Sequence, residues 1–166
     1  MANSFHLDAS ALAKRYVPEP GSPQVDAILD SVPTGRIVLA NVAVGEVVSI
    51  FVRKRNAGLL SPADFGEAMA DFESEIVRSA DISKLPVTNR LATSSFSLIV
   101  AHALNSTDAV ILRPALAIAH KLRAGGGDLV VVAADQRLLR PARAEGLSTF
   151  NPERQDQAAL AGFVGP

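Results

Sequence analysis

The sequence predicts a single α/β domain in which a small central parallel β-sheet lies between two layers of helices. Two apolar segments, 37–40 and 129–133, are rich in β-branched residues and have the continuous hydrophobicity of strands covered on both faces. Helical patterns separate these strands, and this alternation is typical of parallel strands joined by crossover helices. The length of 166 residues suits one domain with a single core.

The first half of the chain alternates short strands with helices. Its expected elements are a strand over 4–7, helices over 9–16 and 22–30, the strand over 37–40, a helix from Asn41 towards Arg55 and a helix that begins at 61–64. Pro18 and Pro20 end the first helix. Ser22 is a typical N-cap, and Pro23 is a typical first helical residue.

The second half continues the same alternation. Its expected elements are helices over 88–104 and 108–122, the strand over 129–133, a helix over 136–144 and an edge strand over 148–150. Ser106 or Thr107 is the expected cap of the helix over 108–122, and Pro114 inside that helix predicts a kink or an early boundary. We expect the domain to extend over 1–152 and a loosely ordered tail to follow over 153–166.

The composition excludes several kinds of site. The chain has no cysteine, which excludes disulfides and thiolate-bound zinc, and its three histidines are too few and scattered for a histidine-rich metal site. A metal ion would therefore be held mainly by oxygen, which favours hard cations. Because the formal net charge is −1, nucleic acid would have to bind a local basic patch.

The sequence predicts a soluble, cytoplasmic protein. Residues 1–7 lack the basic segment and the long apolar segment of a secretory signal. Because no apolar run is long enough to cross a bilayer, we expect no association with membranes.

Four acidic residues are expected at or beside the carboxyl ends of strands. Asp8 directly follows the first strand, and Asp135 lies just beyond the strand over 129–133. Glu46 lies roughly one to two turns into the helix after the second strand, and Asp108 opens a later helix. Since function gathers at the carboxyl edge of open α/β sheets, these acids form a candidate site.

The surroundings of these acids favour a shared cation. Glu46 is flanked by valines and has no adjacent Lys or Arg, and Asp108 precedes the apolar segment 109–112. Carboxylates in such surroundings are rarely buried without a partner, and one cation would neutralise several of them. Mg²⁺ or Mn²⁺ held in this way can support phosphodiester hydrolysis, so the pattern suits a nuclease.

Each acid also has a simpler structural interpretation. Asp135 has the position of an ordinary helix N-cap, and Asp108 that of an acid in the first turn of a helix. Glu46 could lie on the surface of an amphipathic helix. The residues alone leave both interpretations open.

Four motifs in order resemble the PIN-domain family and, within it, the VapC-like toxins of bacterial toxin–antitoxin pairs. The N-terminal motif is Leu7-Asp8-Ala9-Ser10-Ala11-Leu12, continuing through Lys14, Tyr16 and Glu19-Pro20-Gly21-Ser22. The other motifs are Val44-Gly45-Glu46-Val47-Val48, Thr107-Asp108-Ala109-Val110, and a C-terminal motif from Val131 through Asp135 and Ala144-Glu145-Gly146-Leu147 to Asn151-Pro152. The resemblance covers nearly the whole chain, from about Phe5 to Pro152.

The resemblance implies a PIN-like three-layer α/β/α nuclease domain that acts as a metal-dependent endoribonuclease. The residues that match the family's acidic quartet, which binds Mg²⁺ or Mn²⁺, are Asp8, Glu46, Asp108 and Asp135. Ser10 matches a residue that often lies beside the site. Toxins of this family usually cut transfer or ribosomal RNA, form homodimers and are inhibited by a cognate antitoxin, so the same is expected here.

Three positions depart from the family pattern. Ala133 stands where the family often has Thr or Ser, and Ile111 stands where it often has His. The segment before the third acid, which in the family commonly contains an apolar residue and an Arg or Gly, is Asn105-Ser106-Thr107 here. Ala133 supports a second hypothesis, a catalytically weak PIN module that binds RNA or an antitoxin without turnover, whereas the intact quartet argues against it.

Basic residues near the acids are candidate RNA contacts, because cations neutralise phosphates. The residues selected are Arg15, Arg53 and Arg113, and for each of them a solvated helix face is the alternative. A receiver-like signalling domain also has acids at strand ends. Here, however, the strand over 37–40 ends in Ala40-Asn41 without the required acceptor aspartate.

Overall fold

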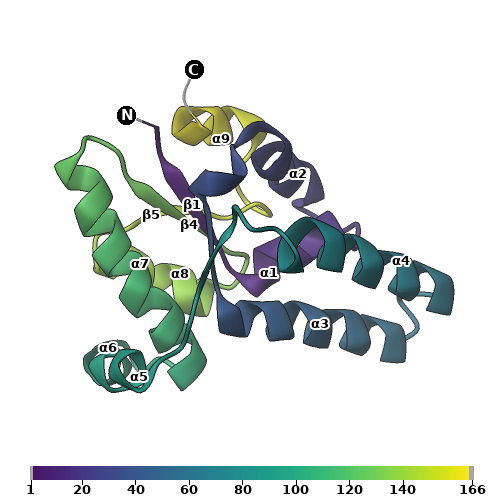
Figure 1. The fold of residues 1–166 in the computed structure, drawn as a ribbon, viewed down its shortest axis with the longest axis horizontal. Helices are drawn as coiled ribbons and strands as arrows, with labels where there is room; N and C mark the ends of the chain where they lie inside the picture. The colour runs from purple at the N-terminus through teal and green to yellow at the C-terminus, as the bar shows by residue number, and fades with distance from the viewer. Residues whose placement is uncertain (1, 165–166) are drawn as a thin grey trace.

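The computed structural model describes residues 2–164, and in this part of the chain five parallel strands form one sheet (Figure 1). The strands are β1 (Ser4–Leu7), β2 (Ile37–Ala40), β3 (Ser83–Leu85), β4 (Leu129–Val132) and β5 (Ser148–Phe150). Their spatial order is β3-β2-β1-β4-β5. The chain therefore reverses its direction of travel across the sheet between β1 and β4, and ligands of open α/β sheets bind beyond the carboxyl ends at such a point.

Helices cover both faces of the sheet, which confirms the predicted three-layer α/β/α arrangement (Figure 1). One face carries α1 (Ala9–Leu12), α2 (Ser22–Ser31), α3 (Asn41–Asn56), α4 (Pro62–Phe72) and α9 (Gln157–Val164). The other face carries α7 (Ser106–Ala124) and α8 (Gln136–Ala144), with α5 (Asn89–Ser94) and α6 (Phe96–His102) beside the start of α7. Short 3-10 turns at Ala13–Arg15 and Thr34–Arg36 and a π turn at Glu73–Val77 complete the helical segments within residues 2–164.

Side chains of the sheet alternate between two apolar cores. In β4, Val130 and Val132 pack beneath the layer of α1 to α4, whereas Leu129 and Val131 pack beneath α7 and α8. The continuous hydrophobicity of this strand therefore reflects burial on both faces. Within residues 2–164, no single helix is long and apolar enough to cross a membrane. The α5–α6 segment and α7 reach that length and composition together, but they are bent by 107°.

His6 is a titratable residue buried in the middle of the sheet. Its side chain is 1% exposed and lies in register with Val38 of β2 and Val131 of β4. In the described part of the chain, neither ring nitrogen has a hydrogen-bond partner. Burial lowers the pKa of His6 to about 4, so the ring is neutral near pH 7.

The predicted elements differ from the structure at several places for local reasons. The helix expected over 88–104 is divided at Ser95, whose buried hydroxyl donates to the carbonyl oxygen of Leu91 (2.8 Å). α7 begins earlier than expected, with Asn105 as its N-cap, and continues through Pro114 without ending there. β3 was not predicted, because a three-residue edge strand carries almost no hydrophobic pattern.

The C-terminal segment forms α9, so the prediction of a loosely ordered tail is wrong. Leu160 is buried in the core shared with α2, and the rings of Phe150 and Phe163 pack edge to face with centroids 6.3 Å apart. Asp156 accepts a backbone hydrogen bond in the first turn of the helix. These apolar contacts and this cap hold the segment against the domain.

The N-terminal and C-terminal motifs meet at Gly21. Its φ of 93° lies in the left-handed region, and a Cβ there would lie 2.8 Å from the carbonyl carbon of Pro152. Beside it lies an ion-pair cluster formed by Lys14, Lys54, Glu19 and Glu153. Lys14 is 2% exposed, and its ammonium lies 2.8 Å from Glu19 and 2.6 Å from Glu153. These contacts tie the 3-10 turn after α1, α3 and the C-terminal segment together.

Candidate active site

The structure brings all four sequence-predicted acids to one hollow at the carboxyl edge of the sheet, with a volume of about 460 Å³. Asp8 follows β1 and Asp135 follows β4, on either side of the point where the chain reverses direction. Glu46 projects from α3 and Asp108 from the first turn of α7. We call this site the acidic hollow. Four separate elements thus supply its carboxylates.

Asp8 is the most enclosed of the four acids, with 8% of its surface exposed. Its Oδ2 accepts hydrogen bonds from the backbone N–H of Ser10 (3.0 Å) and from the Ser10 hydroxyl (2.6 Å). The same hydroxyl oxygen accepts from the backbone N–H of Ala134 (3.0 Å), which joins the ends of β1 and β4. Burial raises the pKa of Asp8, and the charge of Asp135 raises it further, against the lowering effect of the Ser10 bonds.

Glu46 lies on α3 without a protein partner. Within residues 2–164 its carboxylate makes no hydrogen bond and no ion pair. Partial burial raises the pKa of Glu46, and repulsion from Asp8 and Asp108 adds to the rise, while Arg53 opposes it. This carboxylate is therefore held near other negative charges without local neutralisation.

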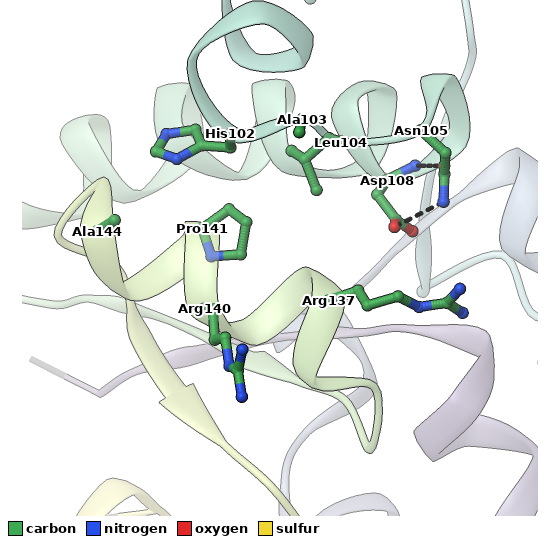
Figure 2. Close-up of a pocket in the computed structure, with 9 residues that line it drawn as sticks. All are labelled: His102, Ala103, Leu104, Asn105, Asp108, Arg137, Arg140, Pro141 and Ala144. Atoms are coloured by element: carbon green, nitrogen blue, oxygen red, sulfur yellow. Dashed lines mark hydrogen bonds between the residues drawn. The ribbon is translucent and has the colours of Figure 1, made fainter.

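Asp108 is positioned by Asn105 at the start of α7. The Asn105 side chain accepts from the backbone N–H of Asp108 (2.8 Å), and its amide donates to Oδ2 of Asp108 (2.8 Å; Figure 2). Burial raises the pKa of Asp108, and the charges of Asp8 and Asp135 raise it further. Asn105 was noted in the sequence as a departure from the family pattern, but its role as cap and orienting group depends on a side-chain conformation that spacing does not give.

Asp135 differs from the other three because it has a cationic partner. It caps α8 by accepting from the backbone N–H of Arg137 (2.8 Å), and its Oδ2 accepts from Nη2 (2.8 Å) and Nε (3.1 Å) of the same guanidinium. These bonds lower the pKa of Asp135. The capping interpretation of Asp135 is therefore correct, and its place in the acidic hollow adds a second possible role. Arg137 was not selected from the sequence, although its spacing of two residues from Asp135 was visible.

The chemistry of the donor set fits Mg²⁺ or Mn²⁺. All four side chains offer carboxylate oxygens, which hard divalent cations prefer, and three of the carboxyl groups have a pKa raised by burial and by the charge of other acids in the hollow. In the part of the chain that the structure describes, no three acidic or histidine side chains are already close enough to hold one ion together. Closing the set around an ion thus requires side-chain movement.

The three arginines selected from the sequence lie in different places. Arg53 lines the acidic hollow. Arg15 does not line it, because its guanidinium is held by carboxylates of α2 and of the π turn: Asp26 at 3.2 Å, Asp30 at 2.9 Å and Glu75 at 3.4 Å. Arg113 also lies outside the lining of the acidic hollow. The structure therefore places Arg53 and Arg137, rather than Arg15 or Arg113, beside the acids.

Ala133 does not line the acidic hollow either. Its side chain is fully buried in the apolar core beneath α7 and α8. In this chain the contact between the strand ends is made by Ser10 and the backbone of Ala134. Replacement of a Thr or Ser by Ala133 therefore leaves the four carboxylates at the same edge of the sheet.

A parallel sheet between helical layers, with acids gathered at its carboxyl edge, defines the class of domain. Residues 6–144 match the PIN domain, and the chain belongs to the PIN domain family. PIN domains are generally nucleases and typically depend on divalent metals. No curated protein matches the chain.

Solved structures show the same fold at low sequence identity. PAE2754 from Pyrobaculum aerophilum is 17% identical, with 98% of both chains covered and a TM-score of 0.60. FitAcB from Neisseria gonorrhoeae is 20% identical, with 91% of this chain and 99% of that chain covered and a TM-score of 0.57. FitAB bound to an IR36 DNA fragment is 18% identical, with 92% and 98% covered and a TM-score of 0.61.

Proposed function

We propose that the protein is a metal-dependent endoribonuclease that hydrolyses RNA phosphodiester bonds with Mg²⁺ or Mn²⁺ in the acidic hollow. The observation that carries this proposal is the convergence of four carboxylates from four elements. Three of them form no ion pair with any residue of the range 2–164 and have a raised pKa. Membership of a nuclease family supports the same conclusion.

In this proposal one set of side chains holds the cation, and another set binds the RNA. Asp8, Glu46, Asp108 and Asp135 would hold the ion, with Ser10 and Asn105 fixing the orientation of two of them. A bound divalent cation supplies charge neutralisation and a water of lowered pKa. Arg53 and Arg137 border the carboxylates and would neutralise the phosphates on either side of the cleaved bond.

We further propose that the protein acts as the toxin of a toxin–antitoxin pair. Supporting this are the VapC-like sequence motifs and the structural likeness to FitAcB and FitAB. In this proposal the substrate is transfer or ribosomal RNA, the active form is a homodimer, and a cognate antitoxin inhibits cleavage by covering the acidic hollow.

A second candidate function is a PIN module that binds RNA or an antitoxin without turnover. It is favoured by the Asp135–Arg137 contact and by the absence, among residues 2–164, of three acids already close enough to share one ion. If Arg137 keeps Asp135 permanently, the remaining acids would bind a cation weakly.

Cleavage of a labelled total-RNA pool distinguishes the two candidates. The purified protein would be assayed with Mg²⁺, with Mn²⁺ and with chelator, beside Asp8→Asn and the control Asp81→Asn, which changes an exposed acid outside the acidic hollow. The nuclease proposal predicts metal-dependent cuts at discrete positions that persist in Asp81→Asn and disappear in Asp8→Asn. Binding of RNA without cutting under either metal would favour the second candidate.

A further inference from the structure

A second hollow opens directly beside the acidic hollow, with a volume of about 510 Å³ (Figure 2). It lies between the turn that joins α6 to α7 and one side of α8. We call it the flanking hollow and define it by Leu104, Arg140, Pro141 and Ala144, together with three residues that it shares with the acidic hollow, Asn105, Asp108 and Arg137. The two hollows therefore adjoin along these shared side chains.

The walls of the flanking hollow combine apolar surface with hydrogen-bonding groups. Leu104 and Pro141 face the hollow from opposite sides (Figure 2), and both are largely buried. The Asn105 amide lies at the end nearest the acids. A flat ring with a polar edge, such as a nucleobase, matches this combination, and the volume falls in the usual range for small-ligand sites.

Cationic groups mark the lower side of the flanking hollow in Figure 2. Arg137 extends from the start of α8 and away from that helix, beneath Asp108, at the boundary with the acidic hollow. Arg140 extends away from the α6–α7 turn, at the rim, and makes no hydrogen bond or ion pair with any residue of the described range 2–164. An exposed guanidinium at a rim is placed to meet a phosphate of a chain that leaves the hollow.

The wall formed by the α6–α7 turn has a fixed shape. Ala103 adopts φ 51°, a left-handed conformation that a non-glycine residue rarely takes outside a tightly determined turn. Beside it, Nε2 of His102 lies 2.6 Å from a carboxylate oxygen of Glu145, just after α8. The turn and α8 are thus joined across one end of the flanking hollow.

We propose that the flanking hollow binds one nucleotide of single-stranded RNA next to the phosphate that is cleaved. The base lies between Leu104 and Pro141, and a phosphate contacts Arg140 as the strand leaves. This inference rests on the proposed nuclease function, because it takes the acidic hollow as the place of the cleaved phosphate. The substrate is then unpaired RNA, because a base paired inside a duplex cannot enter the flanking hollow.

Two substitutions test the hollow without touching the acids. Ala144→Phe fills the flanking hollow from the end of α8, and Ala117→Phe adds the same bulk at an exposed position of α7 outside both hollows. Arg140→Ala removes the rim cation, and Arg154→Ala removes an exposed arginine that lines neither hollow. Thermal unfolding of each variant checks that the domain remains folded.

Binding would be measured by fluorescence anisotropy with a labelled eight-nucleotide single-stranded RNA, with Ca²⁺ in place of Mg²⁺. We expect Ala144→Phe to weaken binding about tenfold, because base stacking and insertion are lost. Arg140→Ala should weaken binding about fivefold and reduce the slope of log affinity against log salt by roughly 0.7, the change for one lost phosphate contact to a single strand. Ala117→Phe and Arg154→Ala should match the wild type in affinity and slope.

The outcomes separate this inference from the proposed function. If the wild type cuts no RNA but Ala144→Phe and Arg140→Ala still weaken binding, the nuclease proposal fails and the nucleotide site stands. If the wild type binds and cuts RNA while both variants bind like their controls, the flanking hollow holds no nucleotide. The inference would also be overturned if Ala144→Phe and Arg140→Ala weakened the binding of duplex RNA as much as that of single-stranded RNA. It would likewise be overturned if the wild type bound no RNA.

Discussion

Two regions of the molecule gather charged side chains, and they balance the charge in different ways. In the ion-pair cluster two lysines face two glutamates, and the buried Lys14 ammonium has a carboxylate on either side. In the acidic hollow burial raises the pKa of Asp8, Glu46 and Asp108, and the charge of at least one other acid of the hollow raises each of them further.

The difference separates structural charge from functional charge. A partly buried set of opposite charges stabilises one conformation once it is formed, and removal of one member leaves the others unpaired. A set of like charges instead destabilises the free protein, and a cation that binds there recovers this free energy. Substitutions in the two regions should therefore have opposite effects on stability and activity.

Glu46→Gln should give the largest effect, a loss of RNA cleavage of at least about a hundredfold, because it removes an ion-holding carboxylate from the acidic hollow. The free energy of unfolding should stay equal or rise, since the change relieves repulsion from Asp8 and Asp108. Single-turnover cleavage and urea denaturation check the two halves of this prediction. An active but destabilised variant would remove the distinction between the regions.

Gly21→Ala should destabilise the protein by about 3 kcal/mol, through a left-handed φ and a collision with the Pro152 backbone. Gly58→Ala is the matched control, because Gly58 also has a positive φ (72°) but a Cβ there meets nothing within 4 Å. The control should cost about 1 kcal/mol. If urea denaturation showed an equal loss of unfolding free energy in both variants, the contact between the N-terminal and C-terminal motifs would contribute little to stability.

His6 is a third case to compare with the ion-pair cluster and the acidic hollow, because burial alone shifts its pKa. A lowered histidine pKa means that the unfolded chain takes up a proton more readily, so stability is greatest above the unfolded pKa of about 6.5 and falls as the pH drops towards about 4. The loss over this range should be about 3 kcal/mol. His6→Leu should remove it, which the difference between the urea curves of variant and wild type at several pH values would measure. Parallel stability profiles would contradict this assignment.

Lys14→Met should destabilise the protein by about 2 kcal/mol, because the buried cation is lost while Glu19 and Glu153 remain, both partly in contact with solvent. Cleavage by the folded variant should remain at the level of the wild type. Urea denaturation and the cleavage assay measure the two effects, with Lys121→Met as an exposed control on α7. A large loss of cleavage at full stability would place Lys14 in the function of the acidic hollow.

Glu46 and Asp108 lie on helices, and the family resemblance was needed to place them with the other acids. The sequence alone predicts the sheet's buried strands and the meeting of Asp8 with Asp135. Both follow from backbone rules: apolar segments form the buried strands, and residues after parallel strands share one edge. Asp8 and Asp135 meet for this reason, even though 126 other residues separate them along the chain.

What could not be predicted depends on side-chain conformation or on weak local pattern. Arg15 was selected because it lies near Asp8 in sequence, but the acids of α2 and the π turn hold it elsewhere. Arg137 and Asn105 were missed as partners of the acids, since their roles depend on rotamers. α9 was missed because a short apolar segment after a polar one has no pattern that predicts packing on α2.

The most direct test of a metal centre in the acidic hollow is a titration of the purified protein with Mn²⁺, followed by the electron paramagnetic resonance signal of the free ion. The wild type and Asp81→Asn should bind the ion at a saturable site, and Asp8→Asn with Glu46→Gln in one chain should lose that binding. If the wild type leaves the signal of free Mn²⁺ undiminished, or if the double variant binds equally well, the acidic hollow is not a metal centre.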